Sequence, residues 1–256
     1  MVKYNGIACI TGASSGIGLA TAKALQKLGY RLLLLARRLE LLEAAKLELE
    51  NLGAKVYVAQ LDVRDRVAVT HVFSSLPEEW KCIDVLVNNA GLALGFSKFY
   101  EGDPEHWDTM IDTNVKGLLY VTRAVSPGMI ARNSGHIVNI GSIAGKEVYD
   151  KGNIYCGTKF AVDAITKSMR IELAEHGIRV TSIHPGAVET EFSIVRFEGD
   201  ASRAKTVYEG FDNLLAEDIA DAIEYVVSRK PHININELVI MPQAQASAGS
   251  IIRKKV

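Results

Sequence analysis

Short apolar runs alternate along the chain with longer segments in which apolar positions recur every three or four residues. The short runs are apolar on both faces, which is typical of strands in a parallel sheet that helices cover on either side. We expect strands at residues 6–11, 31–36, 55–60, 83–88, 136–141, 179–184 and 237–241. The segments with helical periodicity are residues 16–28, 39–52, 67–76, 104–132, 155–176 and 217–228.

This alternation predicts a doubly wound α/β fold with seven parallel strands, right-handed crossovers and helices on both faces of the sheet. Residues 1–256 contain no repeat and no linker, so we expect a single domain. Pro104 suits a first helical turn, and three glycines fall where helices would end: Gly29, Gly53 and Gly177. Residues 185–215 have no clear element, and a lid over the substrate commonly lies at that place in such folds.

Composition and charge exclude several classes of protein. The 256 residues are 48% hydrophobic and 23% charged with a formal charge of −1, which argues against a general nucleic-acid binder and an electrostatic membrane binder. The opening residues have too short an apolar run for a secretory signal, and no apolar stretch approaches a membrane span. We therefore expect a cytoplasmic protein. Three cysteines without a Cys-x-x-Cys pair suggest neither a disulfide framework nor a metal site.

The first expected strand leads directly into TGASSGIG, residues 11–18, which opens the first helix. Glycines at 12, 16 and 18 would let the backbone approach a pyrophosphate, and the helix end would present free N–H groups and a positive dipole. The alternative is a tight turn that simply needs glycine. The strand–turn–helix context is the one that a dinucleotide site requires, and it favours the phosphate loop.

The end of the second strand bears on which dinucleotide fits. An NAD site would carry an acidic residue there for the ribose 2′-hydroxyl, whereas this chain has Arg37 and Arg38. Guanidinium groups suit a 2′-phosphate, so the pair predicts NADP, although two arginines could also begin a solvated helix. Asp62, after the third strand, would lie at the same edge near an adenine, and NNAG at 88–91 ends the fourth strand there.

The stretch NIYCGTKF, residues 153–160, places Tyr155 and Lys159 on one face of a helix. The spacing by itself is not specific. Together with TGASSGIG, NNAG, Asn114 and Ser142, however, the pair resembles the short-chain dehydrogenase/reductase family in order and in spacing over nearly the whole chain. The resemblance implies a Rossmann-type domain, a nicotinamide cofactor and hydride transfer to or from a carbonyl carbon.

The resemblance assigns the catalytic roles to Asn114, Ser142, Tyr155 and Lys159. Tyr155 would be the base, with its pKa lowered from near 10 by Lys159 and the oxidised nicotinamide. Ser142 would hold the substrate oxygen, and Asn114 would bind a water that passes protons from Lys159, although alone it could simply bond its own helix. The cofactor would contact Gly12, Ser14, Ser15, Gly16, Ile17, Gly18, Arg37, Arg38, Asp62, Val63, Asn89, Ala90, Gly91, Tyr155, Lys159, Pro185, Gly186 and Val188.

Four further stretches, at residues 88–95, 110–118, 185–200 and 231–247, are similar to the NADP-dependent 3-hydroxy acid dehydrogenases. That group acts on serine, L-allo-threonine and related short acids such as 3-hydroxypropionate. Some relatives carry an extra residue where this chain reads AVETEF, which leaves the lid contacts open. Arg196 is the candidate that would grip the substrate carboxylate beside Ser142 and Tyr155, unless it is solvated or paired with Glu198 or Asp200.

Two other functions fit parts of the sequence. A 3-oxoacyl-carrier-protein reductase, or another NADPH carbonyl reductase, would share the fold, cofactor and tetrad, but VIMPQAQAS replaces the Val-Asp-Gly-Gly-like stretch that commonly follows its last strand. A non-catalytic NADP(H) sensor would usually have lost the tyrosine or the lysine. The family also implies a homotetramer formed through the two long helices, 104–132 and 155–176, and the tail at 247–256 would either cross an interface or fray.

Overall fold

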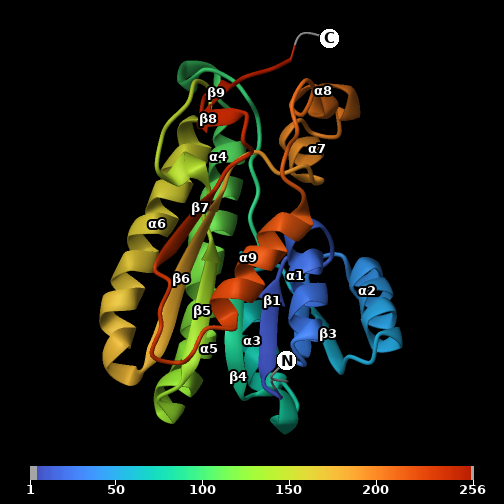
Figure 1. Ribbon diagram of the computed structural model, residues 1–256, viewed down its shortest axis with the longest axis vertical. Coiled ribbons are helices and arrows are strands. Elements are labelled where there is room, and N and C mark those ends of the chain that lie inside the picture. Colours follow the sequence, from blue (N-terminus) through green and yellow to red (C-terminus); the bar gives the residue numbers. More distant parts are fainter. Residues whose placement is uncertain (1–4, 255–256) are drawn as a thin grey trace.

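Seven parallel strands form the sheet, in the order β3-β2-β1-β4-β5-β6-β7 (Figure 1). The computed structural model describes residues 5–254. The predicted α/β fold is confirmed, and each predicted strand lies within one residue of its expected ends. The strands are β1 (Ile7–Thr11), β2 (Arg31–Ala36), β3 (Val56–Gln60), β4 (Ile83–Asn88), β5 (Gly135–Ile140), β6 (Ile178–Pro185) and β7 (Glu237–Ile240).

Two layers of helices cover the sheet because its strands are apolar on both faces (Figure 1). One layer holds α1 (Gly16–Lys27), α2 (Leu39–Asn51) and α9 (Ala216–Val227). The other holds α3 (Arg66–Ser75), α4 (Pro104–Ile111), α5 (Leu118–Arg132) and α6 (Asn153–Leu173). Short 3₁₀ turns lie at η1 (Glu78–Trp80), η2 (Phe99–Glu101), η4 (Ile143–Gly145) and η5 (Ala174–His176).

The long helix expected at 104–132 is not continuous. It begins as expected at Pro104, where the Asp103 side chain accepts a hydrogen bond from the Glu105 N–H. Its middle, η3 (Asp112–Gly117), is a π-helix that separates α4 from α5. A π-turn inside a helix is rare, and those that occur are often at functional sites. This one carries Asn114. The π-turn has no local sequence signal, so a continuous helix was the natural expectation.

A chain of buried side-chain amides and hydroxyls joins α5, β4, β5 and α6 behind the strand ends. The Asn88 amide donates to the Thr122 hydroxyl and to the side-chain oxygen of Asn139, both at 2.9 Å. The Asn139 amide in turn donates to the Thr166 hydroxyl at 2.9 Å. These bonds fix the two helices on the sheet at specific positions, because a shifted helix would leave buried donors without acceptors.

The segment between β6 and α9 contains two short helices, α7 (Phe192–Arg196) and α8 (Ala201–Thr206), which the sequence did not predict. The two ends of this segment lie side by side, joined by an isolated β-bridge between Val188 and Leu214. The chain end forms a hairpin of β8 (Gln245–Ser247) and β9 (Ser250–Ile251) at the same end of the molecule (Figure 1). The tail therefore packs on its own chain as far as residue 254, and its last two residues lie outside the described part.

None of the helices within residues 5–254 is long and apolar enough to cross a membrane.

Replacing Asn139 with Ala is expected to lower the free energy of unfolding by about 1–3 kcal/mol, because the Asn88 amide loses one buried acceptor and the Thr166 hydroxyl loses its donor. Urea unfolding followed by circular dichroism measures the change. Thr70→Ala, which removes an exposed hydroxyl bonded to its own helix, is the matched control and should change stability little. Equal stability of both variants would show that the buried amide chain does not anchor the helices.

Candidate active site

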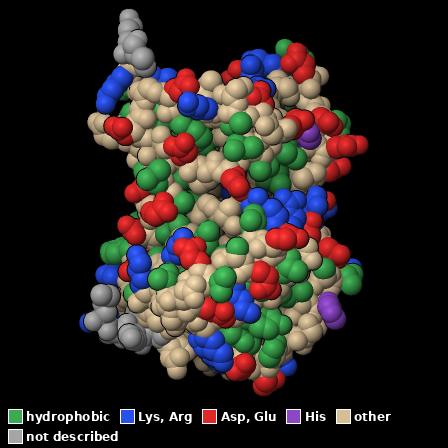
Figure 2. Space-filling model, turned by 90° about the vertical axis from the view of Figure 1, so that its right-hand side faces the viewer, with side chains coloured by type: hydrophobic (Ala, Val, Ile, Leu, Met, Phe, Trp, Pro, Cys, Tyr) green, Lys and Arg blue, Asp and Glu red, His purple; other side chains and the backbone are tan. Residues whose placement is uncertain are grey.

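A cavity of about 1020 Å³ opens where β1, β4, β5 and β6 end. Figure 2 shows a hollow across one face of the molecule, with lysine and arginine side chains gathered beside it. The strand order reverses between β1 and β4, and doubly wound sheets bind ligands outside such a point. The expected site residues that line the cavity are Gly12, Ser14, Ser15, Gly16, Ile17, Arg37, Arg38, Asp62, Val63, Asn89, Ala90, Gly91, Ser142, Tyr155, Lys159, Pro185, Gly186, Val188 and Arg196.

The glycine loop after β1 packs tightly against the end of β4. Gly12 and Gly16 have φ values of +65° and +53°, a conformation that side chains with a Cβ rarely adopt. The Asn89 amide donates to the carbonyls of Thr11 and Gly12 at 2.9 and 3.1 Å. Gly18 does not line the cavity; a Cβ there would lie 2.4 Å from the Gly12 carbonyl oxygen. The loop thus leaves room for a ligand at the start of α1, where free N–H groups favour a phosphate.

A basic corner lies beside this loop. The Arg38 guanidinium donates to the Ser15 hydroxyl at 2.8 Å and to the Glu191 carboxylate at 2.7 Å. Arg37 lines the same cavity. Two guanidinium groups and hydroxyls at a helix start form a suitable environment for a phosphate monoester. Glu191, at the start of α7, was missed by the sequence analysis because its partner lies 153 residues earlier in the chain.

Asp62 lines the cavity, and its carboxylate is already paired. The Arg64 guanidinium donates to both carboxylate oxygens, at 3.0 Å from Nε and 2.6 Å from Nη2. This hydrogen bonding lowers the pKa of Asp62. Asp62 therefore presents a fixed, ionised carboxylate, and its orientation is set by a residue two positions away.

Tyr155, Lys159 and Ser142 meet at the inner end of the cavity. Both Tyr155 and Lys159 are buried on α6, and the Lys159 ammonium lies 5.9 Å from the centre of the Tyr155 ring. Lys159 donates to the Ile140 carbonyl at 2.9 Å. The Ser142 hydroxyl accepts from the Ala144 N–H at 3.1 Å, which orients its oxygen.

Burial sets the pKa of Tyr155 in the chain alone. It raises that pKa, Tyr149 adds to the effect, and the hydrogen bond with Ser142 and the charge of Arg196 oppose it only in part. Burial also lowers the pKa of Lys159, to about 8. Desolvation disfavours the charged form of each group, so the protein alone holds a neutral phenol. The lowered Tyr155 pKa expected with oxidised nicotinamide bound stays a prediction.

Asn114 is buried behind the cavity, and both its side-chain oxygen and its side-chain nitrogen are hydrogen-bonded. Its side chain accepts from the Leu92 N–H and donates to the Leu92 carbonyl, both at 2.8 Å, and it also donates to the Thr158 hydroxyl at 3.0 Å. The π-turn aims this amide at the loop after β4 and at α6. The water-binding role expected of Asn114 stays a prediction.

Arg196 extends from α7 toward the end of the cavity where Tyr155 lies. Its guanidinium donates to the Tyr149 hydroxyl at 2.9 Å and lies 4.7 Å from the centre of the Phe96 ring and 5.8 Å from that of Tyr155. Within residues 5–254 it forms no ion pair with Glu198 or Asp200, the two carboxylates considered from the sequence; Glu198 lies near His106 and Asp200 caps α8.

The aromatic walls of this end, Phe96, Tyr149 and Phe192, were not predicted. Phe192 packs edge-on against Tyr155 with ring centres 5.5 Å apart. These side chains come from three separate segments of the chain, and no role was assigned to any of them from the sequence. Only the fold brings them together around Arg196 and Tyr155.

Comparison with known proteins adds three findings. Residues 6–200 match the family described as short chain dehydrogenase. The NADP-dependent 3-hydroxy acid dehydrogenases YdfG of Salmonella typhi and of Escherichia coli K12 are 46% and 45% identical, over 97% of this chain and 99% and 100% of their own. The closed form of serine dehydrogenase complexed with NADP⁺ superposes with a TM-score of 0.92 at 45% identity, over 97% of this chain and 100% of that one. The chain therefore belongs to the short-chain dehydrogenase family, as its motifs predicted.

Proposed function

We propose that the protein is an NADP-dependent oxidoreductase that oxidises the hydroxyl carbon of a short 3-hydroxy acid, or reduces the corresponding 3-oxo compound. The observation that carries the proposal is the Arg196 guanidinium, which lies 5.8 Å from the Tyr155 ring inside the cavity. A cation at that distance from the base selects an acid whose carboxylate and reacting oxygen are separated by few atoms. Similar chains named as NADP-dependent 3-hydroxy acid dehydrogenases support this choice.

The residues present fit NADP. The positive-φ glycines leave space at the start of α1, and Arg37, Arg38 and Ser15 offer donors where a 2′-phosphate would lie. When bound, the nicotinamide accepts or supplies the hydride. The residues after β4 and β6, from Asn89 to Gly91 and from Pro185 to Val188, line the remaining length of the cavity.

Tyr155, Ser142 and Lys159 supply the proton chemistry. Tyr155 removes the hydroxyl proton of the substrate as hydride leaves its carbon, and returns it in the reverse direction. Ser142 donates a hydrogen bond to the same substrate oxygen and stabilises the charge that develops there. Burial lowers the pKa of Lys159 to about 8, so it exchanges a proton near neutral pH and can restore Tyr155. Lys159 would also hold the nicotinamide ribose when NADP is bound. Asn114 holds the loop after β4 against α6 and binds the water that connects Lys159 to solvent.

Arg196 also separates this proposal from its alternatives. A carrier-protein reductase handles a thioester that has no free carboxylate, whereas here a guanidinium and three aromatic rings enclose the catalytic end. A sensor without catalysis has no use for the buried pair of Tyr155 and Lys159, whose burial carries a desolvation cost. Residues 185–215, which include α7, would act as the lid that carries Arg196 to the substrate.

A homotetramer and a cytoplasmic location remain part of the proposal. Exposed apolar side chains on α5 and α6, among them Leu119, Phe160 and Ile171, offer surfaces for self-association. Analytical ultracentrifugation should give the mass of four chains for the wild type. A Phe160→Glu variant should dissociate, whereas Val67→Glu, at an exposed apolar position on α3, should not. A monomeric wild type would remove the tetramer from the proposal.

The reaction is tested by following NADP⁺ reduction at 340 nm with L-serine, L-allo-threonine, 3-hydroxypropionate and 3-hydroxybutyrate. We expect turnover of at least one acid, strong preference for NADP⁺ over NAD⁺, and a loss of at least about a hundredfold in kcat for Tyr155→Phe, because the variant has no base. If NADPH binds and no acid is oxidised, acyl thioesters become the next substrates to test. Failure of those substrates as well would favour the sensor.

Arg196→Met should raise KM for the acid by about 10- to 100-fold, since it removes a charge-assisted hydrogen bond to the carboxylate. KM for NADP⁺ should stay unchanged. Arg229→Met is the matched control, because Arg229 does not line the cavity and stacks on Tyr225 instead. An unaltered KM for the acid in Arg196→Met would exclude Arg196 from substrate binding.

A further inference from the structure

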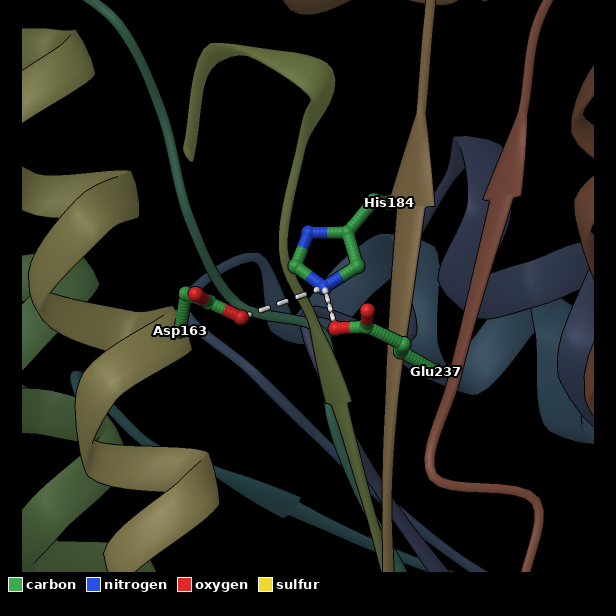
Figure 3. Close-up of side chains that lie close together, drawn as sticks. All are labelled: Asp163, His184 and Glu237. Carbon is green, nitrogen blue, oxygen red and sulfur yellow. Dashed lines mark ion pairs between the residues drawn. The ribbon is translucent and has the colours of Figure 1, made fainter. Parts of the chain in front are cut away.

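A second group of ionisable side chains lies outside the cavity, between α6, β6 and β7. Figure 3 shows Asp163, His184 and Glu237 pointing toward one another from these three elements. The His184 ring is fully buried, and its Nε2 lies 3.6 Å from an Asp163 oxygen and 3.9 Å from a Glu237 oxygen. Three such side chains could hold a metal ion in principle.

The cation of this cluster is supplied by the chain itself. The Lys146 ammonium lies between the two carboxylates, 2.8 Å from Asp163 Oδ1 and 2.6 Å from Glu237 Oε2. These are the same two oxygens that face His184. A metal ion would have to displace a lysine that already satisfies both, so the arrangement is an ion-pair network.

His184 connects the network to the catalytic serine. Its Nδ1 lies 3.2 Å from the Ser142 carbonyl oxygen, which can only accept, so Nδ1 carries the proton and donates. Burial and the nearby Lys146 charge lower the pKa of His184, which leaves Nε2 without a proton near neutral pH. Nε2 has no hydrogen-bond partner among the described residues. The imidazole is therefore held in one tautomer, which keeps its donor on Ser142.

Lys146 holds the other end of the same turn. The turn runs from Ser142 through η4 to Gly145, and Lys146 follows immediately. The backbone of the turn lies directly on α6, where a Cβ on Gly145 would come within 2.6 Å of the Lys159 carbonyl oxygen. At the start of the turn, a Cβ on Gly141 would lie 2.6 Å from the His184 Nδ1. His184 and Lys146 thus hold the turn at both ends, against β6, α6 and β7.

We propose that Lys146 and His184 are positioning residues that fix the Ser142 turn relative to Tyr155, and so align the Ser142 hydroxyl with the substrate oxygen. The inference rests on the proposed function of Ser142. The hydrogen bond from Ser142 is strongest when charge develops on the substrate oxygen, so a misaligned turn reduces kcat more than it changes KM. Neither residue lines the cavity, so neither is expected to contact cofactor or substrate.

The test compares the two lysines that share Asp163. Lys146→Met keeps most of the side-chain length and removes the charge. Lys167→Met removes the other partner of Asp163, at 2.7 Å, but Lys167 belongs to α6 itself and joins nothing to the turn. We expect Lys146→Met to lower kcat by about 10- to 100-fold with KM for NADP⁺ unchanged. Lys167→Met should stay within about twofold of the wild type. Lys146→Arg, which keeps the charge, should recover most of the loss.

The histidine is tested by two variants of different hydrogen-bonding capacity. His184→Asn places an amide donor close to the position of Nδ1, and His184→Leu has no donor. We expect His184→Asn to retain most of kcat and His184→Leu to lose it to the same degree as Lys146→Met.

Hydrogen exchange gives a readout that needs no substrate. In the NADPH-bound protein, a peptide covering residues 141–149 should exchange faster in Lys146→Met and His184→Leu than in the wild type or Lys167→Met. If wild-type protein turns over no acid, the proposed function fails, and this exchange measurement alone then decides whether the network holds the turn. Equal kcat losses in Lys146→Met and Lys167→Met, or unchanged exchange of the peptide, would overturn the positioning role.

Discussion

Helix α6 buries a stripe of polar side chains against the sheet, and every other part of the site depends on how these are paired. Tyr155, Lys159, Asp163 and Thr166 are buried at helical spacing on one face. A buried polar group without a partner costs about 1–3 kcal/mol, so the position of the helix is set by its partners. Those partners are the Ile140 carbonyl, Lys146 and Asn139. They fix Tyr155 at the cavity, Asp163 at the charged cluster and Thr166 at the buried amide chain.

The same burial sets the electrostatics of the site. Removal of water raises the pKa of Tyr155 and lowers that of Lys159, so both neutral forms are favoured in the chain alone. A positive charge in the cavity favours the phenolate again, since it acts in a region with little screening. The charge present in the cavity therefore decides which form of Tyr155 is favoured.

The segment between β6 and α9 joins the two ends of the cavity. Near its start Glu191 accepts a hydrogen bond from Arg38 beside the glycine loop, and five residues later Arg196 donates to the Tyr149 hydroxyl near Tyr155. The tail holds the same segment from outside: Gln245 accepts from the Ala187 N–H, and Arg253 donates to the Val207 carbonyl. The Arg38–Glu191 ion pair is exposed, and an exposed ion pair contributes about 0–1 kcal/mol. This pair therefore adds little to the stability of the segment.

The sequence by itself determined the fold and those candidate site residues that belong to short local motifs. Apolar runs and glycines placed the strands within one residue, and motifs of adjacent residues identified the glycine loop, the two arginines and the Tyr155/Lys159 pair. Only the tertiary structure decided the π-turn at Asn114, the pKa shifts of Tyr155 and Lys159, and the partners Glu191, Tyr149 and Phe96. It also decided the Lys146–Asp163–His184–Glu237 network, whose members lie up to 91 residues apart in the chain. The physical reason is that periodicity and turn chemistry act over a few residues, whereas burial and charge depend on contacts between segments that only the folded chain brings together.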